Sequence, residues 1–282
     1  MFVDNYYISE KSEFDYAHSV NLNPDNSDFT LHTHNDFCEI IIFLRGNSEF
    51  RAEGSIYKLT PYDIAISHGT EMHIICHNSP VTPYERVVLH IKNSFFAQNN
   101  CEEFLEFFTN RPLGVDNIIH ADHVIKRNIA QTISDIDKYI DENDTMKHIV
   151  IRSKVIDLLY NLYKIAPKSS KTGFYNDKIK DIIMYINENI SSTLTIDSIA
   201  DNFFISKYYL CHIFKEYSGL TINRYITMKR IFIVKELVAK GWSILNASME
   251  AGFGNYSNFY KAYLKETGIS PKDGLKNQNT RN

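Results

Sequence analysis

The sequence predicts a multidomain protein, in which an N-terminal β-sandwich or barrel with an attached helical element precedes an all-helical C-terminal part. The chain has 282 residues, which exceeds the roughly 100–200 residues of one domain, so two domains are the default. Apolar residues form short runs before residue 91 and follow a helical period after residue 125, whereas residues 166–173 follow no period. The composition, 44% hydrophobic and 23% charged, excludes a mainly disordered chain.

Short apolar runs with Gly and Pro turns between them fill residues 31–91, a spacing typical of strands in a β-sandwich or barrel. An aromatic stretch precedes them and is either an ordinary first strand or an arm that closes over a ligand. The stretch contains Phe2, Tyr6, Tyr7, Phe14 and Tyr16. The predicted strands are Glu39–Leu44, Glu49–Ala52, Ile56–Leu59, Ile64–Ile66, Met72–Cys76 and Arg86–Ile91.

Two amphipathic helices follow the strands. Isoleucines step by 4, 4, 3 and 4 from Ile125 to Ile140, and apolar residues step by 4, 3, 4 and 3 from Ile151 to Ile165. The period is then lost, which predicts a linker. We therefore divide the chain into a sheet domain at 1–120, a helical element at 121–165, a linker at 166–177 and a helical domain at 178–277.

Cysteine usage and hydropathy indicate the compartment. The 4 cysteines lie far apart with no C-x-x-C pair, which favours reduced thiols over a disulfide framework. No secretory signal is recognised, and the longest purely apolar run, Ile40–Leu44, is far shorter than the roughly 20 residues that span a bilayer. We expect a soluble, cytoplasmic protein with no membrane partner.

The net charge of −4 conceals an asymmetry between the two parts of the chain. Residues 178–282 hold 14 Lys and Arg against 9 Asp and Glu, a net of +5, and residues 1–177 hold 16 against 25, a net of −9. A basic C-terminal part suggests that this part alone meets a polyanion. Chance clustering of solvated charge is the alternative.

The C-terminal hundred residues predict two short helices with a tight turn between them, a helix-turn-helix. The first helix starts in Leu194–Ala200, and Ser206 caps the second, which runs from Lys207 to Tyr217 and stops at Gly219. One side of the second helix is apolar. The other side offers hydrogen-bond donors, an aromatic ring and a cation, which suit phosphates and base edges but are also found on a solvated helix. That side holds Tyr208, Cys211, His212 and Lys215.

This pattern repeats 49 residues later, where Tyr263–Gly268 echoes Phe214–Gly219. Ala247-Ser248 likewise echoes Ile199-Ala200, with one extra residue in the second turn. The two predicted units, about 196–219 and 244–268, are joined by one continuous helix from Ile222 to Lys240. Two equivalent units on a rigid connector are hard to explain as a generic helical bundle.

These residues resemble the AraC/XylS-type transcription regulators. Ser206–Lys215 with Gly219 and Arg230 resembles the first motif of that family, and Ala251–Phe259 with Gly268–Pro271 resembles its second and most diagnostic motif. The resemblance covers about residues 178–276 and implies that both units of one subunit enter double-stranded promoter DNA. The DNA-binding residues that follow from it are Ser206, Lys207, Tyr208, Cys211, His212, Lys215, Arg230, Asn255, Tyr256, Ser257, Tyr260 and Lys261.

Three positions depart from the pattern of that family. Ser248 stands where the family usually has Ala, and Leu264 stands where a basic residue is common. Gly274-Leu275 replaces an aromatic-Arg pair. The departures bear on the phosphate contacts of the second unit rather than on its fold.

A second resemblance, near the N-terminus, is to the cupins, which are small double-sheet jelly rolls and the usual sensor domains of AraC-type regulators. It implies an N-terminal β jelly-roll with the helical element attached. His32 and His34 point the same way on a strand, and Glu39 joins them only if Asn35-Asp36 turns or bulges. The first cupin motif resembles the set His32-Thr33-His34, Glu39 and Gly46 of this sequence. The second motif, in a degraded form, resembles Pro61-Tyr62-Asp63 and His73.

Four residues of these motifs are the candidate effector-binding residues, His32, His34, Glu39 and His73. Together with His77 they offer nitrogen and oxygen ligands for a divalent metal ion. We favour instead a metal-free polar pocket, because AraC-type cupins commonly keep the histidines without metal and the second motif lacks its usual glycine and asparagine. No other cofactor is predicted.

The sequence therefore predicts a transcription activator that responds to a small-molecule effector, for which the family resemblance implies a sugar or related metabolite. The resemblance also implies a homodimer paired through 121–165 and a contact with RNA polymerase, although the apolar stripes of 121–165 equally suit packing on the barrel. The alternative is a metal-dependent cupin enzyme, an isomerase or dioxygenase, with an appended DNA-binding part. We expect no enzyme, because an enzyme would not need two helix-turn-helix units. Elsewhere in the sequence no phosphate loop, nucleophile elbow or catalytic triad is recognised.

Overall fold

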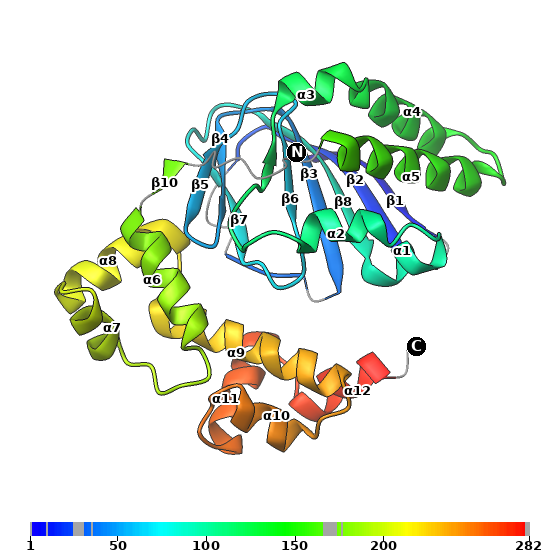
Figure 1. Cartoon of the computed structure of the whole chain (residues 1–282). Helices are drawn as coiled ribbons and strands as arrows, with labels where there is room; N and C mark the ends of the chain where they lie inside the picture. Colours follow the sequence, from blue (N-terminus) through cyan, green and yellow to red (C-terminus); the bar gives the residue numbers. More distant parts are fainter. Residues whose placement is uncertain are drawn as a thin grey trace. The chain divides into compact units, whose positions relative to one another are not determined.

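The computed structural model describes residues 2–9, 11–24, 31–34, 36–165, 174–175 and 177–279. The chain divides into two compact units, Met1–Asn176 and Asp177–Asn282. Figure 1 shows that the first unit is built on β-sheets and that the described part of the second is built from helices. Within the described ranges, no helix is long and apolar enough to cross a membrane.

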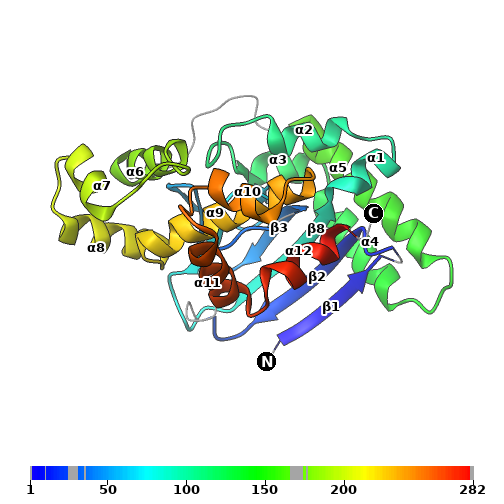
Figure 2. The same ribbon diagram turned by 90° about the horizontal axis from the view of Figure 1, so that it is seen from below.

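Two antiparallel sheets form the first unit, with strand orders β1-β2-β8-β3-β6-β9 and β10-β5-β4-β7. The six strands predicted between residues 39 and 91 are confirmed as β3 to β8. The aromatic N-terminal stretch forms the paired strands β1 and β2 at one edge of the larger sheet, visible in Figure 2. The strands are β1 Phe2–Ile8, β2 Phe14–Asn21, β3 Phe37–Arg45, β4 Ser48–Ala52, β5 Ser55–Lys58, β6 Ile64–Ser67, β7 His73–His77, β8 Tyr84–Lys92, β9 Ile118–Ile119 and β10 Phe174–Tyr175.

Alternate side chains of β3 explain the layers of this unit. Ile40 and Ile42 lie in a core shared with the helices α4 (Ile129–Asp141) and α5 (Lys147–Ile165). Ile41 and Phe43 lie in a second core that β4, β5 and β7 of the smaller sheet complete. A strand buried on both faces needs a continuous apolar run, which is what the sequence of β3 provides.

The helices after the sheets pack onto them. Ile133 of α4 and Leu158 of α5 are at most 4% exposed and belong to the same core as Ile40. The apolar stripes of 121–165 are therefore used within one chain, which is the second of the two alternatives that the sequence left open. The remaining helices of this unit are α1 Asn93–Gln98, α2 Glu103–Thr109 and α3 Ala121–Lys126.

One predicted helix is broken in two. The isoleucine period predicts a single helix from Ile125 onwards, but Asn128 has a φ of +55°, which ends α3 and sets the start of α4. Ile125 consequently leaves the stripe and is 65% exposed. Asn is among the few residues that adopt this left-handed conformation readily.

A polar contact fastens α4 to the larger sheet. The Tyr16 hydroxyl donates to Asp137 at 2.8 Å, and His18 bonds Asp137 through Nδ1 at 2.8 Å and Glu85 through Nε2 at 3.1 Å. The hydrogen bond to Asp137 is the main cause that raises the pKa of His18, against the opposing effect of burial. The imidazole thus sits between carboxylates of α4 and β8, which favour its charged form.

Most of the predicted linker lies outside the described residues, at 166–173 and at 176. Its described residues are β10, which pairs antiparallel with β5 of the smaller sheet, and Asp177, which begins the first helix of the second unit. The two residues of β10 thus belong to a sheet of the first unit.

Capped helices form the second unit. Ser206 caps α8 by accepting from the Tyr209 N–H, and Asn255 caps α11 by accepting from the Asn258 N–H. Both helices end at a left-handed glycine, as the sequence predicts. The helices are α6 Asp177–Glu188, α7 Ile196–Asn202, α8 Lys207–Ser218, α9 Ile222–Ala239, α10 Ile244–Glu250, α11 Tyr256–Thr267 and α12 Pro271–Asn279.

The repeat in the sequence is present in the structure. We call α7 and α8 the first head and α10 and α11 the second head; α9 joins them, as predicted for residues 222–240. Ile199 and Ala200 are buried in the first head, as are Ala247 and Ser248 in the second. The extra residue of the second head lies in the turn between its helices.

Two of the three departures from the family pattern have a visible explanation. The Ser248 hydroxyl is satisfied by the Leu245 carbonyl at 2.7 Å, so the buried serine leaves no unpaired donor. A Cβ at residue 274 would stand 2.4 Å from the Tyr263 hydroxyl, which explains the glycine, and Leu275 is buried in the core of the second head. Leu264 is 41% exposed.

Candidate functional site

A cluster of histidines around one glutamate joins the two sheets of the first unit. His32 pairs with His73 at the start of β7, where the backbone N–H of each donates to the carbonyl of the other at 3.1 and 3.0 Å. Glu39 lies on β3 of the larger sheet and is only 5% exposed. The cluster therefore receives side chains from both sheets, and all four predicted effector-binding residues belong to it.

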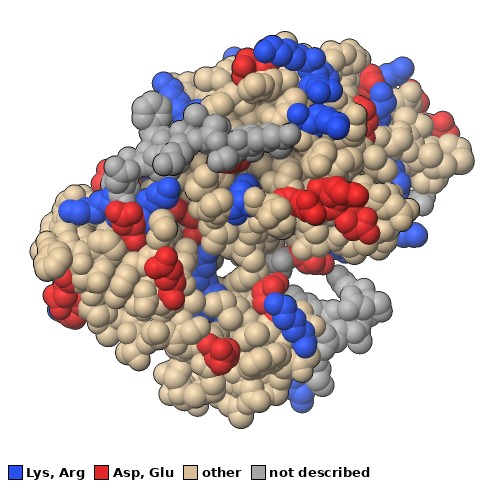
Figure 3. All heavy atoms as spheres, in the orientation of Figure 1, with Lys and Arg blue, Asp and Glu red and all other residues tan. Residues whose placement is uncertain are grey.

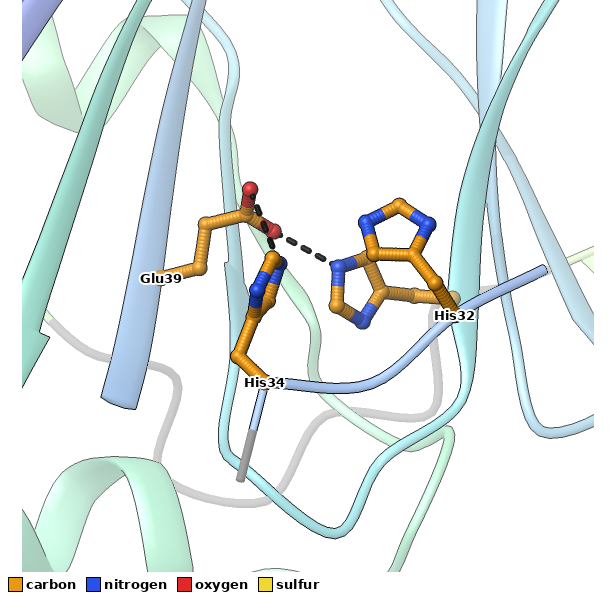
Figure 4. A group of neighbouring side chains, drawn as sticks. His32, His34 and Glu39 are labelled. Atoms are coloured by element: carbon orange, nitrogen blue, oxygen red, sulfur yellow. Dashed lines mark ion pairs between the residues drawn. The ribbon is translucent and has the colours of Figure 1, made fainter. Parts of the chain in front are cut away.

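A turn brings Glu39 to the side of the histidines. Asp36 lies in a turn, and the Phe37 N–H reaches back to the His34 carbonyl at 3.5 Å. Asn35, the other residue of the predicted turn, lies outside the described residues. Figure 4 shows that the side chains of His34 and Glu39 point toward one another. The turn resets the strand alternation that would otherwise have placed Glu39 on the opposite face.

Glu39 is the centre of the cluster. Its Oε2 lies 2.7 Å from His73 Nε2 and accepts from the Ser67 hydroxyl at 3.3 Å. Its Oε1 lies 3.4 Å from His34 Nε2 and 3.1 Å from His90 Nε2. Both carboxylate oxygens are thus surrounded by groups able to donate hydrogen bonds.

His90 was not identified from the sequence. It lies on β8 directly opposite Glu39 of β3, and Asp15 of β2 is its partner on the other side. Its Nδ1 bonds Asp15 at 2.8 Å, which orients the ring toward Glu39. The strand register that places these three residues in one row is a non-local property, and no local motif marks it.

The electrostatics of the cluster follow from this arrangement. Burial alone would raise the pKa of Glu39, but the charge of His73 and the nearby ring nitrogens of His34 and His90 outweigh it and hold this pKa well below its usual value. Burial lowers the pKa of His90, but hydrogen bonds to Asp15 and Glu39 prevail and raise it to about 9. The site therefore combines a carboxylate with an imidazole, that of His90, whose charged form is favoured.

The donor set fits a divalent metal ion. One ligand atom from each of His32, His34, Glu39 and His73 lies within 4.8 Å of all the others, and three imidazoles with one carboxylate suit zinc and related ions. The same atoms also suit hydroxyl groups of an organic ligand, because they include both donors and acceptors. His77 does not join them: its Nδ1 bonds the Ser48 hydroxyl at 2.9 Å, and its ring lies against Tyr84.

The predicted DNA-binding side chains of the first head share one exposed face of α8. Tyr208 is 83% exposed, and its ring stacks parallel to that of His212 with the centroids 6.3 Å apart. Leu210 and Phe214 on the opposite face are fully buried. The exposed residues, which we call the first reading face, are Ser206, Tyr208, Cys211, His212 and Lys215.

The second head has an equivalent face on α11. Phe259 and Tyr263 are buried, and the rings of Tyr256 and Tyr260 lie side by side on the outside with the centroids 6.2 Å apart. Aromatic rings, hydroxyls and one cation are thus presented together. The exposed residues, which we call the second reading face, are Asn255, Tyr256, Ser257, Tyr260 and Lys261.

Two basic residues predicted to bind DNA already have partners within the protein. Lys207 is exposed but forms an ion pair with Asp197 of α7. Arg230 is half-buried, and its guanidinium donates to the carbonyls of Ile190 at 2.9 Å and Ser192 at 2.7 Å. On the face shown in Figure 3, Lys and Arg side chains are interspersed with Asp and Glu. Charge alone therefore does not mark a DNA interface on that face.

Two protein-family models match the chain. An AraC-like ligand binding domain matches residues 21–142, and a helix-turn-helix domain matches residues 199–277. The first match covers the histidine cluster, and the second covers both heads except for the start of α7.

Relatives with curated names agree with these matches. "Regulatory protein PocR" of Salmonella typhimurium is 26% identical over 57% of this chain and 56% of its own length. The "Melibiose operon regulatory protein" of Escherichia coli is 28% identical over 60% of this chain and 62% of its own length. The chain thus spans little more than half the length of these two relatives. The "Lactose operon transcription activator" of Staphylococcus xylosus is 23% identical over 82% of this chain and 81% of its own.

The order of the matched domains along the chain is the order of the two units in the structure. The N-terminal sheets hold a candidate ligand site, and the C-terminal heads expose two polar helix faces. The chain therefore belongs to the AraC-type transcription regulators, which are not enzymes, and combines a cupin-like ligand-binding domain with a DNA-binding helix-turn-helix domain.

Proposed function

We propose that this protein is a transcription activator that binds a specific promoter sequence through both heads and responds to a small polyhydroxylated effector, a sugar or a close relative, bound at the histidine cluster. The observation that carries the proposal is the cluster itself. Glu39 and His73 are almost fully buried, and they meet His34 and His90 between residues of both sheets. Buried polar groups gathered in this way are costly unless they are paired or bind a ligand.

The chemistry of the cluster supports a hydroxyl-rich effector. A carboxylate that accepts and imidazoles that donate can bind vicinal hydroxyls, and the buried ring of Phe50 stacks on His73 and supports it from behind. The names of two relatives refer to the melibiose and lactose operons, and one of them is called an activator. We therefore take sugars as the first effectors to test and a metal-free site as the default.

The active form is a homodimer that contacts RNA polymerase at the promoter. Because the apolar stripes of α4 and α5 are buried in their own chain, subunit contacts through 121–165 require the outer face of these helices. That face is apolar enough to serve: Ile149 is 50% exposed and Tyr160 is 46% exposed.

Sequencing of genomic DNA fragments retained by the purified protein, with and without a panel of mono- and disaccharides, tests this function. We expect one class of retained sequences, with a retention that changes with one sugar in the panel. Metal analysis of the same preparation distinguishes a metal-free effector site from a metal site. Stoichiometric zinc or a related ion in the purified protein would show that the cluster binds metal. Failure to enrich any sequence would contradict the proposed function.

A further inference from the structure

The turn between α6 and α7, residues 189–192, is held by the connector helix α9. The Arg230 guanidinium donates to the carbonyls of Ile190 and Ser192, one on each side of Ser191. The Tyr225 hydroxyl, also on α9, donates to Asn187 at 3.2 Å near the end of α6. This turn precedes α7 of the first head, so its contacts with α9 fix the position at which the chain enters that head.

The same turn touches the second head. Gly252 lies in the turn between α10 and α11, with a φ of +89°. A Cβ built on Gly252 would stand 2.8 Å from the Ser191 carbonyl oxygen and 2.9 Å from its Cα. Both atoms are backbone, so a side chain at residue 252 would push the turn at Ser191 away.

Comparison of the two heads shows that the helix-turn-helix itself does not require this glycine. Phe204 is the equivalent of Gly252: each has a positive φ, and the N–H of each bonds the carbonyl three residues earlier, that of Asp201 or Met249. Phe204 holds a φ of +52° with a side chain that is 95% exposed. The turn thus accepts even a large side chain, and the close approach of Ser191 accounts for glycine in the second head.

We propose that residues 190–192 form a clasp between the two heads, which fixes the spacing and rotation of the two reading faces, and that Arg230 and Gly252 are positioning residues for DNA recognition. The proposal rests on the proposed function, since it requires both heads to bind DNA. Without the clasp, the two heads would be related only through α9. The second head packs against α9 through a shared core, and Arg224 of α9 pairs with Glu266 of α11, so the first head would be the one free to shift relative to the second. With the clasp, residues 190–192, which precede the first head, pack against the turn between α10 and α11 of the second head.

A matched pair of glycines allows a sharp test. Gly254 also has a positive φ, +70°, but a Cβ on it meets no atom within 4 Å. Gly252→Ala and Gly254→Ala therefore carry similar backbone strain, and only Gly252→Ala displaces the clasp. Circular dichroism and the fluorescence of Trp242, the only tryptophan, confirm that each variant is folded.

The probes are the duplex selected by the wild-type protein, the same duplex with one base pair added or removed between the two sub-sites, and a duplex with one sub-site. We expect the wild type to lose about tenfold in affinity on the altered spacings, comparable to one mismatched base pair. Gly252→Ala should bind the original and the altered spacings with nearly equal affinity, and its affinity for the single sub-site should equal that of the wild type. Gly254→Ala should behave as the wild type on all the duplexes. Equal behaviour of the two variants would overturn the clasp.

Arg230→Met gives an independent measurement should Gly252→Ala fail to fold. We expect it to relax the spacing preference without changing the salt dependence of binding to the single sub-site. A salt slope lowered by about 0.9 would show instead that Arg230 neutralises a phosphate, which contradicts its role in the clasp. A selection in which the wild-type protein enriches no duplex would contradict the proposed function and not the clasp alone.

Discussion

Replacement of Lys215 tests the first reading face quantitatively. Lys215 is exposed on α8 beside His212 and forms no ion pair within the described residues, so its ammonium is available for a DNA phosphate. Each neutralised phosphate contributes about 0.9 to the slope of log affinity against log salt, so Lys215→Ala should lower the slope by about that amount. Between 50 and 200 mM salt, a fourfold change, the affinity ratio of wild type to variant should therefore shrink by about 3.5-fold.

Fluorescence anisotropy of a labelled duplex, titrated at several salt concentrations, measures these slopes. Lys126→Ala is the matched control, because Lys126 is an exposed lysine of α3 in the ligand-binding unit and its loss removes the same charge. We expect this control to keep the wild-type slope. If Lys215→Ala also keeps it, or if both variants lower it equally, Lys215 does not contact phosphate and the assignment of the first reading face is wrong.

Four further results are expected. His212→Ala should alter base preference in a selection experiment rather than lower all affinities equally, because base-edge contacts specify sequence. His34→Ala or Glu39→Ala should abolish the effector response in DNA-binding titrations while basal binding remains, since the cluster and the heads lie in separate units. Five base pairs inserted between the sub-sites should remove most single-subunit affinity in the same titrations, because half a helical turn carries one sub-site to the opposite side of the duplex. His18 has a raised pKa, so the stability it provides is complete below its unfolded value of 6.5 and is lost as the pH rises through the folded value; urea unfolding of His18→Gln should show a smaller loss of stability between pH 6 and pH 9 than the wild type.

Local patterns in the sequence predicted much of the fold. The strands from β3 to β8, the caps at Ser206 and Asn255 and the repeat of the two heads all depend on residues near one another in the chain, so short-range periodicity and turn chemistry were sufficient. The break at Asn128 was missed, because a run of isoleucines continues through it and a single left-handed residue leaves no periodic signal.

The parts that were missed depend on contacts between distant segments. His90 joins the histidine cluster only because β8 pairs with β3 in a particular register, and Arg230 turns inward only because the α6–α7 turn offers it two carbonyls. His77 was placed with the cluster by strand parity, yet it lies four residues along β7 from His73 and bonds Ser48. Pairing register and packing of helix ends are tertiary properties, which motif spacing does not encode.

The single extra residue in the turn of the second head determines how results on one head transfer to the other. Residues of α7 correspond to those of α10 at a distance of 48, whereas residues of α8 correspond to those of α11 at a distance of 49. His212 therefore stands where the second head has Lys261, and Lys215 stands where it has Leu264. Because equivalent positions carry different side chains, the two heads are not interchangeable. A subunit placed on a DNA site in the reverse direction would therefore not make the same contacts. Under the proposed function, the difference between α8 and α11 therefore gives the bound protein a defined direction along the promoter.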